Sequence, residues 1–151
     1  MYCPTFETMD SFYIYLSSDD SITFFPNNKP HDFTIDLGRN INLEGKWVCG
    51  LKEINCYVKK ETTKILYVLC NSCDQSYAKN TYMPILRTVA IDVEEGMFIE
   101  EFSDTFYKKL STNNISTVTI SIRGSDGKNA TFSSEPFKCI LHFKRIENVK
   151  E

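Results

Sequence analysis

Histidine and glycine are scarce in this chain, and the sequence motifs of common enzymes are missing. Its 151 residues include six glycines and two histidines, His31 and His142. Neither histidine stands beside a candidate nucleophile, and no glycine-rich loop is arranged to bind phosphate. The sequence therefore predicts a protein that is not an enzyme and that uses no cofactor.

Long apolar runs and a strong net charge are also missing. No stretch approaches the roughly 18–20 apolar residues needed to span a bilayer, and the first residues lack the basic start and apolar run of a secretory signal. The formal net charge is −3, which is too small to attract nucleic acid or an anionic membrane over long range. We expect no membrane partner, no nucleic-acid partner, and a location in the cytosol or nucleus of the cell that makes the chain.

The six cysteines form no recognisable metal site or disulfide framework. Cys70 and Cys73 have the spacing of half a zinc site or of a redox dithiol, but the chain has no second pair of this kind. A redox dithiol also normally precedes a helix in an alternating strand–helix fold. We interpret the spacing as a coincidence, so Cys70 and Cys73 remain weak metal candidates. All six thiols are expected to be reduced, namely Cys3, Cys49, Cys56, Cys70, Cys73 and Cys139.

Alternation of apolar and polar residues is the main pattern that the sequence does contain. Residues 11–16, 33–37 and 117–122 alternate with a period of two, and turn-forming clusters at residues 25–28 and 124–129 separate such runs. This pattern is typical of half-buried antiparallel strands. We predict a mainly β protein with seven or eight strands in an antiparallel, jelly-roll-like β-sandwich.

One segment departs from this period. From Met97 to Leu110 the apolar residues recur at spacings of three and four, with acids in the first half and Lys108 and Lys109 near the end. This charge order suits a helix dipole. The pattern predicts a single amphipathic helix near residues 97–112. The chain length fits one domain over residues 1–151, with flexible ends at residues 1–10 and 147–151.

Two residues bear on interfaces. Trp47 is a common type of interface anchor, but its apolar neighbours favour a place in the core. Pro84 cannot donate a hydrogen bond within a sheet, so it indicates an edge strand. Edge strands are sites of association, and the candidate interface residues are Met83, Pro84, Ile85 and Leu86.

The block at residues 11–54 resembles a recurring N-terminal pattern in proteins of Maverick/Polinton-type elements and adintovirus-like DNA viruses. The matching segments are FYIYLSS at 12–18, FPNN at 25–28, FTIDL at 33–37, INLEGKW at 41–47 and GLKEI at 50–54. Such elements encode jelly-roll capsid proteins. The resemblance therefore implies a structural protein of the virion, either a capsid protein or a penton-like minor capsid protein.

Three hypotheses follow. The leading one is a non-enzymatic, virus-derived subunit that self-associates or binds other capsid subunits, located in the virion and, during assembly, in the host cytoplasm or nucleus. The alternative is a monomeric β-sandwich module that binds a host protein or nucleic acid. The third is a small protein that depends on a metal or thiol at Cys70 and Cys73.

Overall fold

The structure is a computed structural model, and it describes residues 10–146. The ends predicted to be flexible lie outside the described residues, apart from Asp10, which is exposed. The described residues form eleven strands: β1 (Ser11–Ser17), β2 (Asp32–Asn42), β3 (Lys46–Val58), β4 (Ile65–Cys70), β5 (Ser76–Ala78), β6 (Thr81–Met83), β7 (Ile85–Ala90), β8 (Gly96–Glu101), β9 (Tyr107–Lys109), β10 (Asn114–Gly124) and β11 (Lys138–Ile146).

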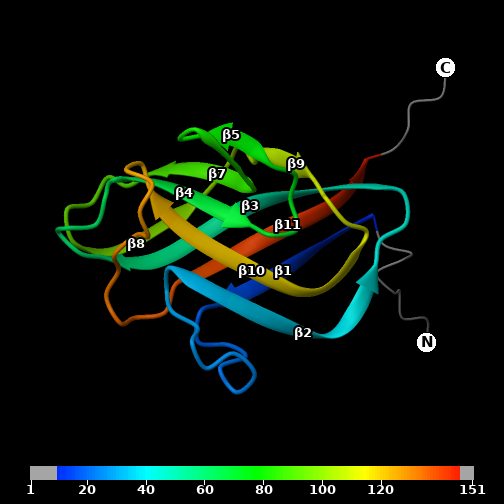
Figure 1. The fold of residues 1–151 in the computed structure, drawn as a ribbon, viewed down its shortest axis with the longest axis horizontal. Coiled ribbons are helices and arrows are strands. Elements are labelled where there is room, and N and C mark those ends of the chain that lie inside the picture. The colour runs from blue at the N-terminus through cyan, green and yellow to red at the C-terminus, as the bar shows by residue number, and fades with distance from the viewer. Residues whose placement is uncertain (1–9, 147–151) are drawn as a thin grey trace.

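Two sheets pack against each other (Figure 1). Sheet A has the order β1-β11-β3-β8, and β9 also pairs with β3; sheet B has the order β2-β10-β4-β7. The strands β5 and β6 form a separate hairpin, with Lys79 and Asn80 in the left-handed region at its turn.

Pairing among the eight longer strands is nested and antiparallel. The first pairs with the last (β1 with β11), the second with the last but one (β2 with β10), and the same order continues with β3–β8 and β4–β7. Two facing sheets with this nested order make up a jelly roll. The predicted antiparallel, jelly-roll-like sandwich is confirmed.

The core lies between the two sheets and follows from the alternation. Along β10, Val118, Ile120 and Ile122 are fully buried, while the residues between them reach the outer face. In sheet A, Phe12 stacks on Phe143 with ring centroids 5.1 Å apart. Trp47 is 5% exposed and lies in the same core, as its apolar neighbours indicated.

The predicted helix near residues 97–112 is wrong, because the described residues contain no α-helix. Met97 and Ile99 are exposed while Phe98 between them is buried, which is a period of two. The physical reason is tertiary. The second half of β3 needs a hydrogen-bonding partner, and β8 supplies it, with Tyr57 opposite Met97. The apolar spacing that looked helical results from two short strands, β8 and β9, joined by a turn.

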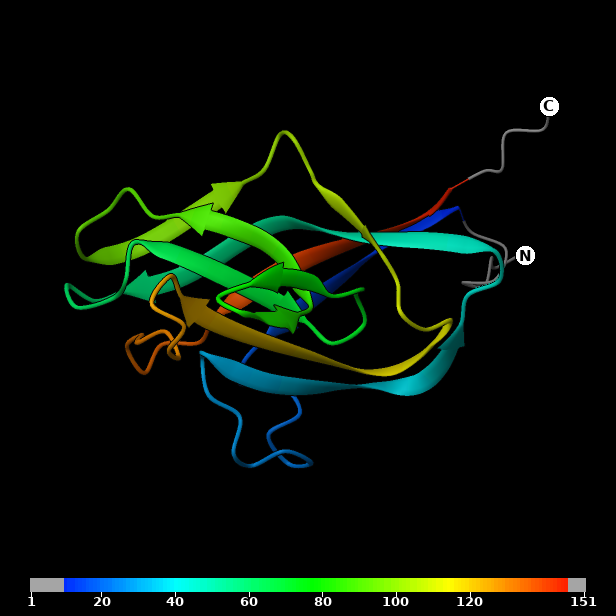
Figure 2. The same ribbon diagram turned by 45° about the horizontal axis from the view of Figure 1, so that its top comes forward.

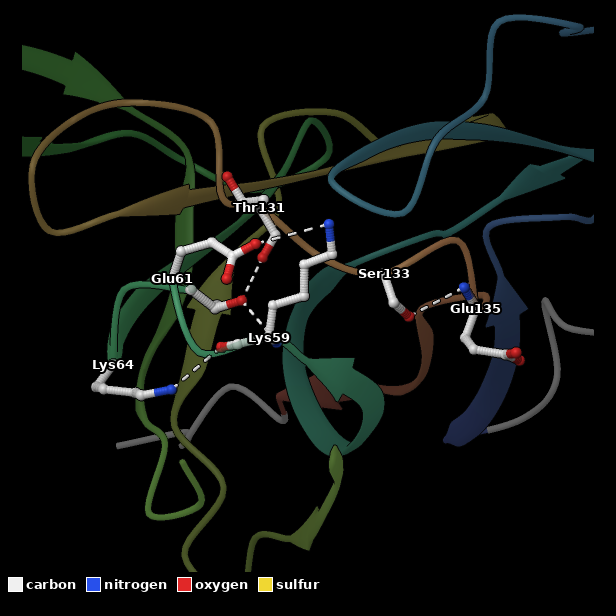
Figure 3. Close-up of polar contacts among 7 residues, drawn as sticks. Lys59, Glu61, Lys64, Thr131, Ser133 and Glu135 are labelled. Atoms are coloured by element: carbon white, nitrogen blue, oxygen red, sulfur yellow. Dashed lines mark hydrogen bonds and ion pairs between the residues drawn. The ribbon is translucent and has the colours of Figure 1, made fainter. Parts of the chain in front are cut away.

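A buried hydroxyl links two loops of the sandwich through hydrogen bonds. Thr62 is 2% exposed; its Oγ1 accepts a hydrogen bond from the backbone N–H of Lys59 at 3.0 Å and donates one to the carbonyl of Thr131. Around it, the Lys64 ammonium donates to the carbonyl of Lys59 at 3.4 Å, and Lys59 pairs with Glu61 at 3.7 Å (Figure 3). These contacts connect the turn after β3 to the loop before β11.

The start of β1 and the end of β11 lie together. The two strands pair over their full common length, with Ser11 opposite Lys144, and the N–H of Arg145 donates to the carbonyl of Asp10 at 2.8 Å. Both strands leave sheet A at the same end of the molecule (Figure 2). The described residues contain no helix that is long and apolar enough to cross a membrane.

Candidate functional site

The cysteines predicted as weak metal candidates lie inside the core. Cys70 and Cys73 are at most 2% exposed, and both form side-chain hydrogen bonds with Cys49 from β3. Sequence reasoning missed Cys49, because only the fold brings β3 beside the end of β4. No group of three or more His, Cys, Asp or Glu side chains among residues 10–146 is arranged to bind a metal ion.

The buried thiols differ in pKa: side-chain hydrogen bonds with Cys49 and Cys73 lower the pKa of Cys70, whereas burial has the opposite effect at Cys49 and Cys56. Burial raises the pKa of Cys49 well above its ordinary value and raises the pKa of Cys56 to about 12. A thiol must lose its proton before it attacks a substrate or binds a metal. Ionisation of Cys49 and Cys56 is therefore disfavoured at neutral pH, and both side chains fill the core.

A surface cavity of about 260 Å³ lies beside Trp47, where the loops before β3 and after β9 meet. Its lining combines apolar groups such as Leu43 and Leu110 with Lys46 and Lys109. None of the lining residues is an acid, a histidine or a cysteine.

The outer face of sheet A carries a cluster of aromatic rings. Tyr13 from β1 stacks on His142 from β11 with centroids 4.5 Å apart, and the Tyr107 hydroxyl lies 2.7 Å from His142 Nδ1. The Lys144 ammonium lies 4.0 Å from the centroid of the Tyr107 ring. Burial, then the positive charges of Lys144 and Lys52, lower the pKa of His142. His142 is therefore neutral at pH 7.

Gly50 makes this cluster possible. In the register of sheet A it lies between His142 and Tyr107. A Cβ atom at Gly50 would clash with the Thr105 side chain and lie 2.9 Å from the carbonyl oxygen of Phe106. Because Gly50 has no side chain, the segment of Thr105 and Phe106 can pass close to β3, so that Tyr107 reaches His142.

Large apolar side chains remain exposed around the cluster on the same face. Tyr15 is 72% exposed, and Met97 and Ile99 on β8 are more than half exposed. The sheet register places charged residues, including Glu53, Glu101 and Lys138, on this face between the cluster and Met97. The sequence did not reveal this surface, because it depends on which strands become neighbours.

The four sheet edges differ in how they are protected. The edge of β2 is covered by the loop before it: the Asn28 amide donates to the carbonyl of Thr34 at 2.8 Å and its oxygen accepts the Thr34 N–H at 3.0 Å. The Ser21 hydroxyl similarly accepts the N–H of Asp36 at 3.0 Å. These side chains occupy the hydrogen-bonding positions that another strand would use.

The candidate interface residues lie at another edge. Met83 belongs to β6 and pairs with Ser76, Pro84 lies between the strands, and Ile85 and Leu86 begin β7, which pairs with β4 and forms an edge of sheet B. Ile85 is half-buried and Leu86 is buried, so the exposed part of this segment is its backbone and the Ile85 side chain. The third and fourth edges are β8 and β1.

Comparison with solved structures identifies the architecture. The penton protein of mavirus superposes with a TM-score of 0.64 at 6% sequence identity, over 90% of this chain and 100% of that chain. The chain has the fold of a viral penton protein. This match agrees with the resemblance of residues 11–54 to proteins of Maverick-type elements.

A second structure, the virus-like particle of the extra small virus of the giant freshwater prawn Macrobrachium rosenbergii, matches over 91% of this chain and 80% of that chain at 10% identity. Its TM-score of 0.30 is too low to carry an argument. No protein-family model matches the sequence, and no curated protein is similar to it.

Proposed function

We propose that this protein is a structural subunit of a viral capsid, of the penton kind, and that it acts by self-association without catalysis. The observation that carries the proposal is the superposition on the mavirus penton protein, which covers that whole chain. Residues 10–146 form a nested, two-sheet jelly roll, which is consistent with this match. The proposed location is the virion, after assembly in the host cytoplasm or nucleus.

The surface supports this proposal. Its exposed large apolar side chains include Tyr13, Tyr15 and Ile99 on the outer face of sheet A, and others lie on the loop before β2 and on the β5–β6 hairpin. Burial of such side chains between subunits is the main driving force of protein association. The proposed partners are further copies of this chain and other capsid subunits.

The edge at residues 83–86 is the proposed contact between subunits within a ring. Pro84 stops the strand from extending toward β6, and β7 presents one open side beyond its pairing with β4. Contacts between unlike surfaces of successive copies close into a ring when the rotation between copies fits.

The test is the oligomeric state. The purified protein is examined by size-exclusion chromatography with light scattering and by negative-stain electron microscopy over a range of concentrations and salt. Closed rings of five copies are the expected result. A protein that stays strictly monomeric at high concentration would contradict the proposal and favour the monomeric binding module.

A further inference from the structure

Among residues 10–146 no further strand pairs with β1 beyond β11, and the backbone geometry of β1 shows which groups face outward. The N–H of Arg145 donates to the carbonyl of Asp10, and the N–H of Ser18 donates to the carbonyl of Phe137 at 2.9 Å. In an antiparallel pair, hydrogen-bonded residues alternate with residues that point away. The even-numbered residues of β1 therefore bond to β11. The N–H and C=O groups of Tyr13 and Tyr15 point away from the sheet.

Charge distinguishes this edge from the other three. The strand β1 (Ser11–Ser17) contains no charged residue. By contrast, β2 carries Asp36 and Arg39, β7 carries Arg87, and β8 ends in two glutamates. Proteins normally protect sheet edges with charges, prolines or covering loops. Within the described residues, Tyr13 and Tyr15 at the centre of β1 have no charge, proline or loop hydrogen bond at this edge, whereas the loop after the strand contacts Ser17.

The sequence of β1 is also nearly the same in both directions. It runs Ser, Phe, Tyr, Ile, Tyr, Leu, Ser around a central Ile14. An antiparallel pair of two identical strands reads one copy forward and the other backward. A strand with this symmetry therefore presents matching side chains to a second copy of itself.

We propose that β1 pairs with β1 of a second copy around a two-fold axis at Ile14, and so joins two copies of sheet A into one continuous sheet. In this register Tyr13 lies opposite Tyr15 of the other copy, and Ile14 lies opposite its own equivalent. The outward-pointing groups of Tyr13 and Tyr15 then form about four backbone hydrogen bonds across the axis. A two-fold contact of this kind uses the same surface on both subunits.

The register keeps every side chain on its appropriate face. Phe12 and Leu16 are buried beneath sheet A and would lie opposite each other across the axis. Tyr13 and Tyr15, 49% and 72% exposed, would form one row of four rings on the outer face. Aromatic pairs across antiparallel strands stabilise a sheet. Tyr15, the most exposed side chain of β1, would then pack beside Tyr13 of the other copy.

Charged residues limit the pairing to this segment. Asp10 precedes β1, while Asp19 and Asp20 follow it, and the Asp20 carboxylate accepts the N–H of Ser17 at 3.2 Å. The backbone of Ser17 is thus already engaged at the end of the strand. A longer overlap would place acids of the two copies beside each other, which is unfavourable.

This inference rests on the proposed self-association and adds a second contact to it. Experiments can contradict either contact without contradicting the other. The ring contact proposed above uses β7, whereas the two-fold contact uses β1 at a different edge. Rings without the two-fold contact would retain the proposed function and overturn the pairing of β1.

Two matched double variants test both the contact and its register. Tyr13→Lys with Tyr15→Lys places like charges opposite each other, whereas Tyr13→Glu with Tyr15→Lys places opposite charges there. Both remove the same two rings and add two charges to the same edge. Sedimentation equilibrium on each protein, in a background with Ile85→Lys to suppress ring contacts, measures dimer formation.

The expected result is a dimer for the background protein, a monomer for the lysine pair, and recovery of at least about tenfold in affinity for the glutamate–lysine pair. High salt should weaken the recovered dimer because it screens the new charge pairs. Equal association of the two double variants would overturn the register. A background protein without a dimer at any concentration would overturn the contact.

A proline variant separates assembly from folding. Tyr15→Pro removes an outward-facing N–H and leaves the hydrogen bonds between β1 and β11 in place, so the fold should remain while the dimer is lost. Circular dichroism and thermal melting check the fold of each variant. A folded Tyr15→Pro protein that still forms the dimer would contradict the proposal.

Discussion

At the scale of single residues, a buried polar group contributes to stability when its hydrogen bonds are satisfied. Thr62 is the clearest case, since one hydroxyl connects two segments far apart in sequence. Loss of such a hydroxyl leaves a backbone donor and an acceptor buried without partners.

We therefore expect Thr62→Val to lower the free energy of unfolding by about 1–3 kcal/mol. Urea denaturation followed by fluorescence measures the change. Thr112→Val is the matched control, because Thr112 is exposed and its hydroxyl bonds locally with Asn114. The control should lie within about 0.5 kcal/mol of the wild type. Equal effects of the two substitutions would contradict this account.

The buried thiols predict a loss of stability in alkali. In the folded state the pKa of Cys56 is raised to about 12 from its ordinary 9.0. The raised value means that stability is fully present below pH 9.0 and falls as the pH rises toward 12, because the unfolded chain ionises first.

Stability measured between these pH values should fall less steeply in Cys56→Ala than in the wild type, by about 1.4 kcal/mol per pH unit. The variant should be less stable at pH 7 because it leaves a small cavity. Parallel pH profiles for the two proteins would show that Cys56 does not contribute this dependence.

At the scale of elements, the segment after β8 shows how one cation contacts two different aromatic environments. The Arg87 guanidinium carbon lies 3.9 Å from the centroid of the Phe102 ring and 4.7 Å from that of Phe106. Phe102 is 4% exposed, whereas Phe106 is 63% exposed. The two rings should therefore contribute differently to the free energy of unfolding because of their burial, since both contact the same cation.

Phe102→Ala should destabilise the fold by about 3–5 kcal/mol, because it removes a buried ring and leaves a cavity. Phe106→Ala should cost less than about 1 kcal/mol, which is the scale of an exposed cation–π contact. Chemical denaturation of both variants is the measurement. A large effect at Phe106 would mean that the exposed ring has a structural role that its surroundings do not indicate.

The same elements show what the sequence could predict. The alternation at residues 33–37 and 117–122 correctly predicted strands, because one face of each is buried and the period follows directly. The prediction for the segment of β8 and β9 was wrong, because its pairing with β3 is a non-local contact that the local spacing of residues does not encode. The predicted edge strand at residues 83–86 is interrupted at Pro84, which lies between β6 and β7, and β7 is an edge of sheet B.

The aromatic cluster could not be predicted for a similar reason. Tyr13, Tyr107 and His142 are brought together by the register of four neighbouring strand segments. Only the completed sheet places Gly50 between two of them. The protection of β2 by Asn28 is likewise a relation between a loop and a strand, and an asparagine in a turn gives no sign of it.

At the scale of the whole molecule, assembly is expected to depend on edges and not on exposed charges. Ile85→Lys should weaken ring formation, because it places a long charged side chain at the proposed β7 contact. Asp126→Asn at the tip of the 124–129 loop should leave assembly unchanged, since isolated exposed charges contribute about 0–1 kcal/mol. Light scattering at matched concentrations compares the two.

Equal assembly of the two variants would exclude the β7 edge as a contact, while leaving other edges available. A strong effect of Asp126→Asn would instead direct attention to the loops at that end of the sandwich.

The closeness of Asp10 and Arg145 has a practical consequence for labelling. A fluorescent protein or a peptide epitope joined at either end of the described chain would emerge from the same end of sheet A. Cargo joined at one end and cargo joined at the other should therefore be displayed on the same side of any shell that these subunits build. A short linker between the two ends, with new ends opened at the 124–129 loop, would give a circular permutant with the sheets unchanged.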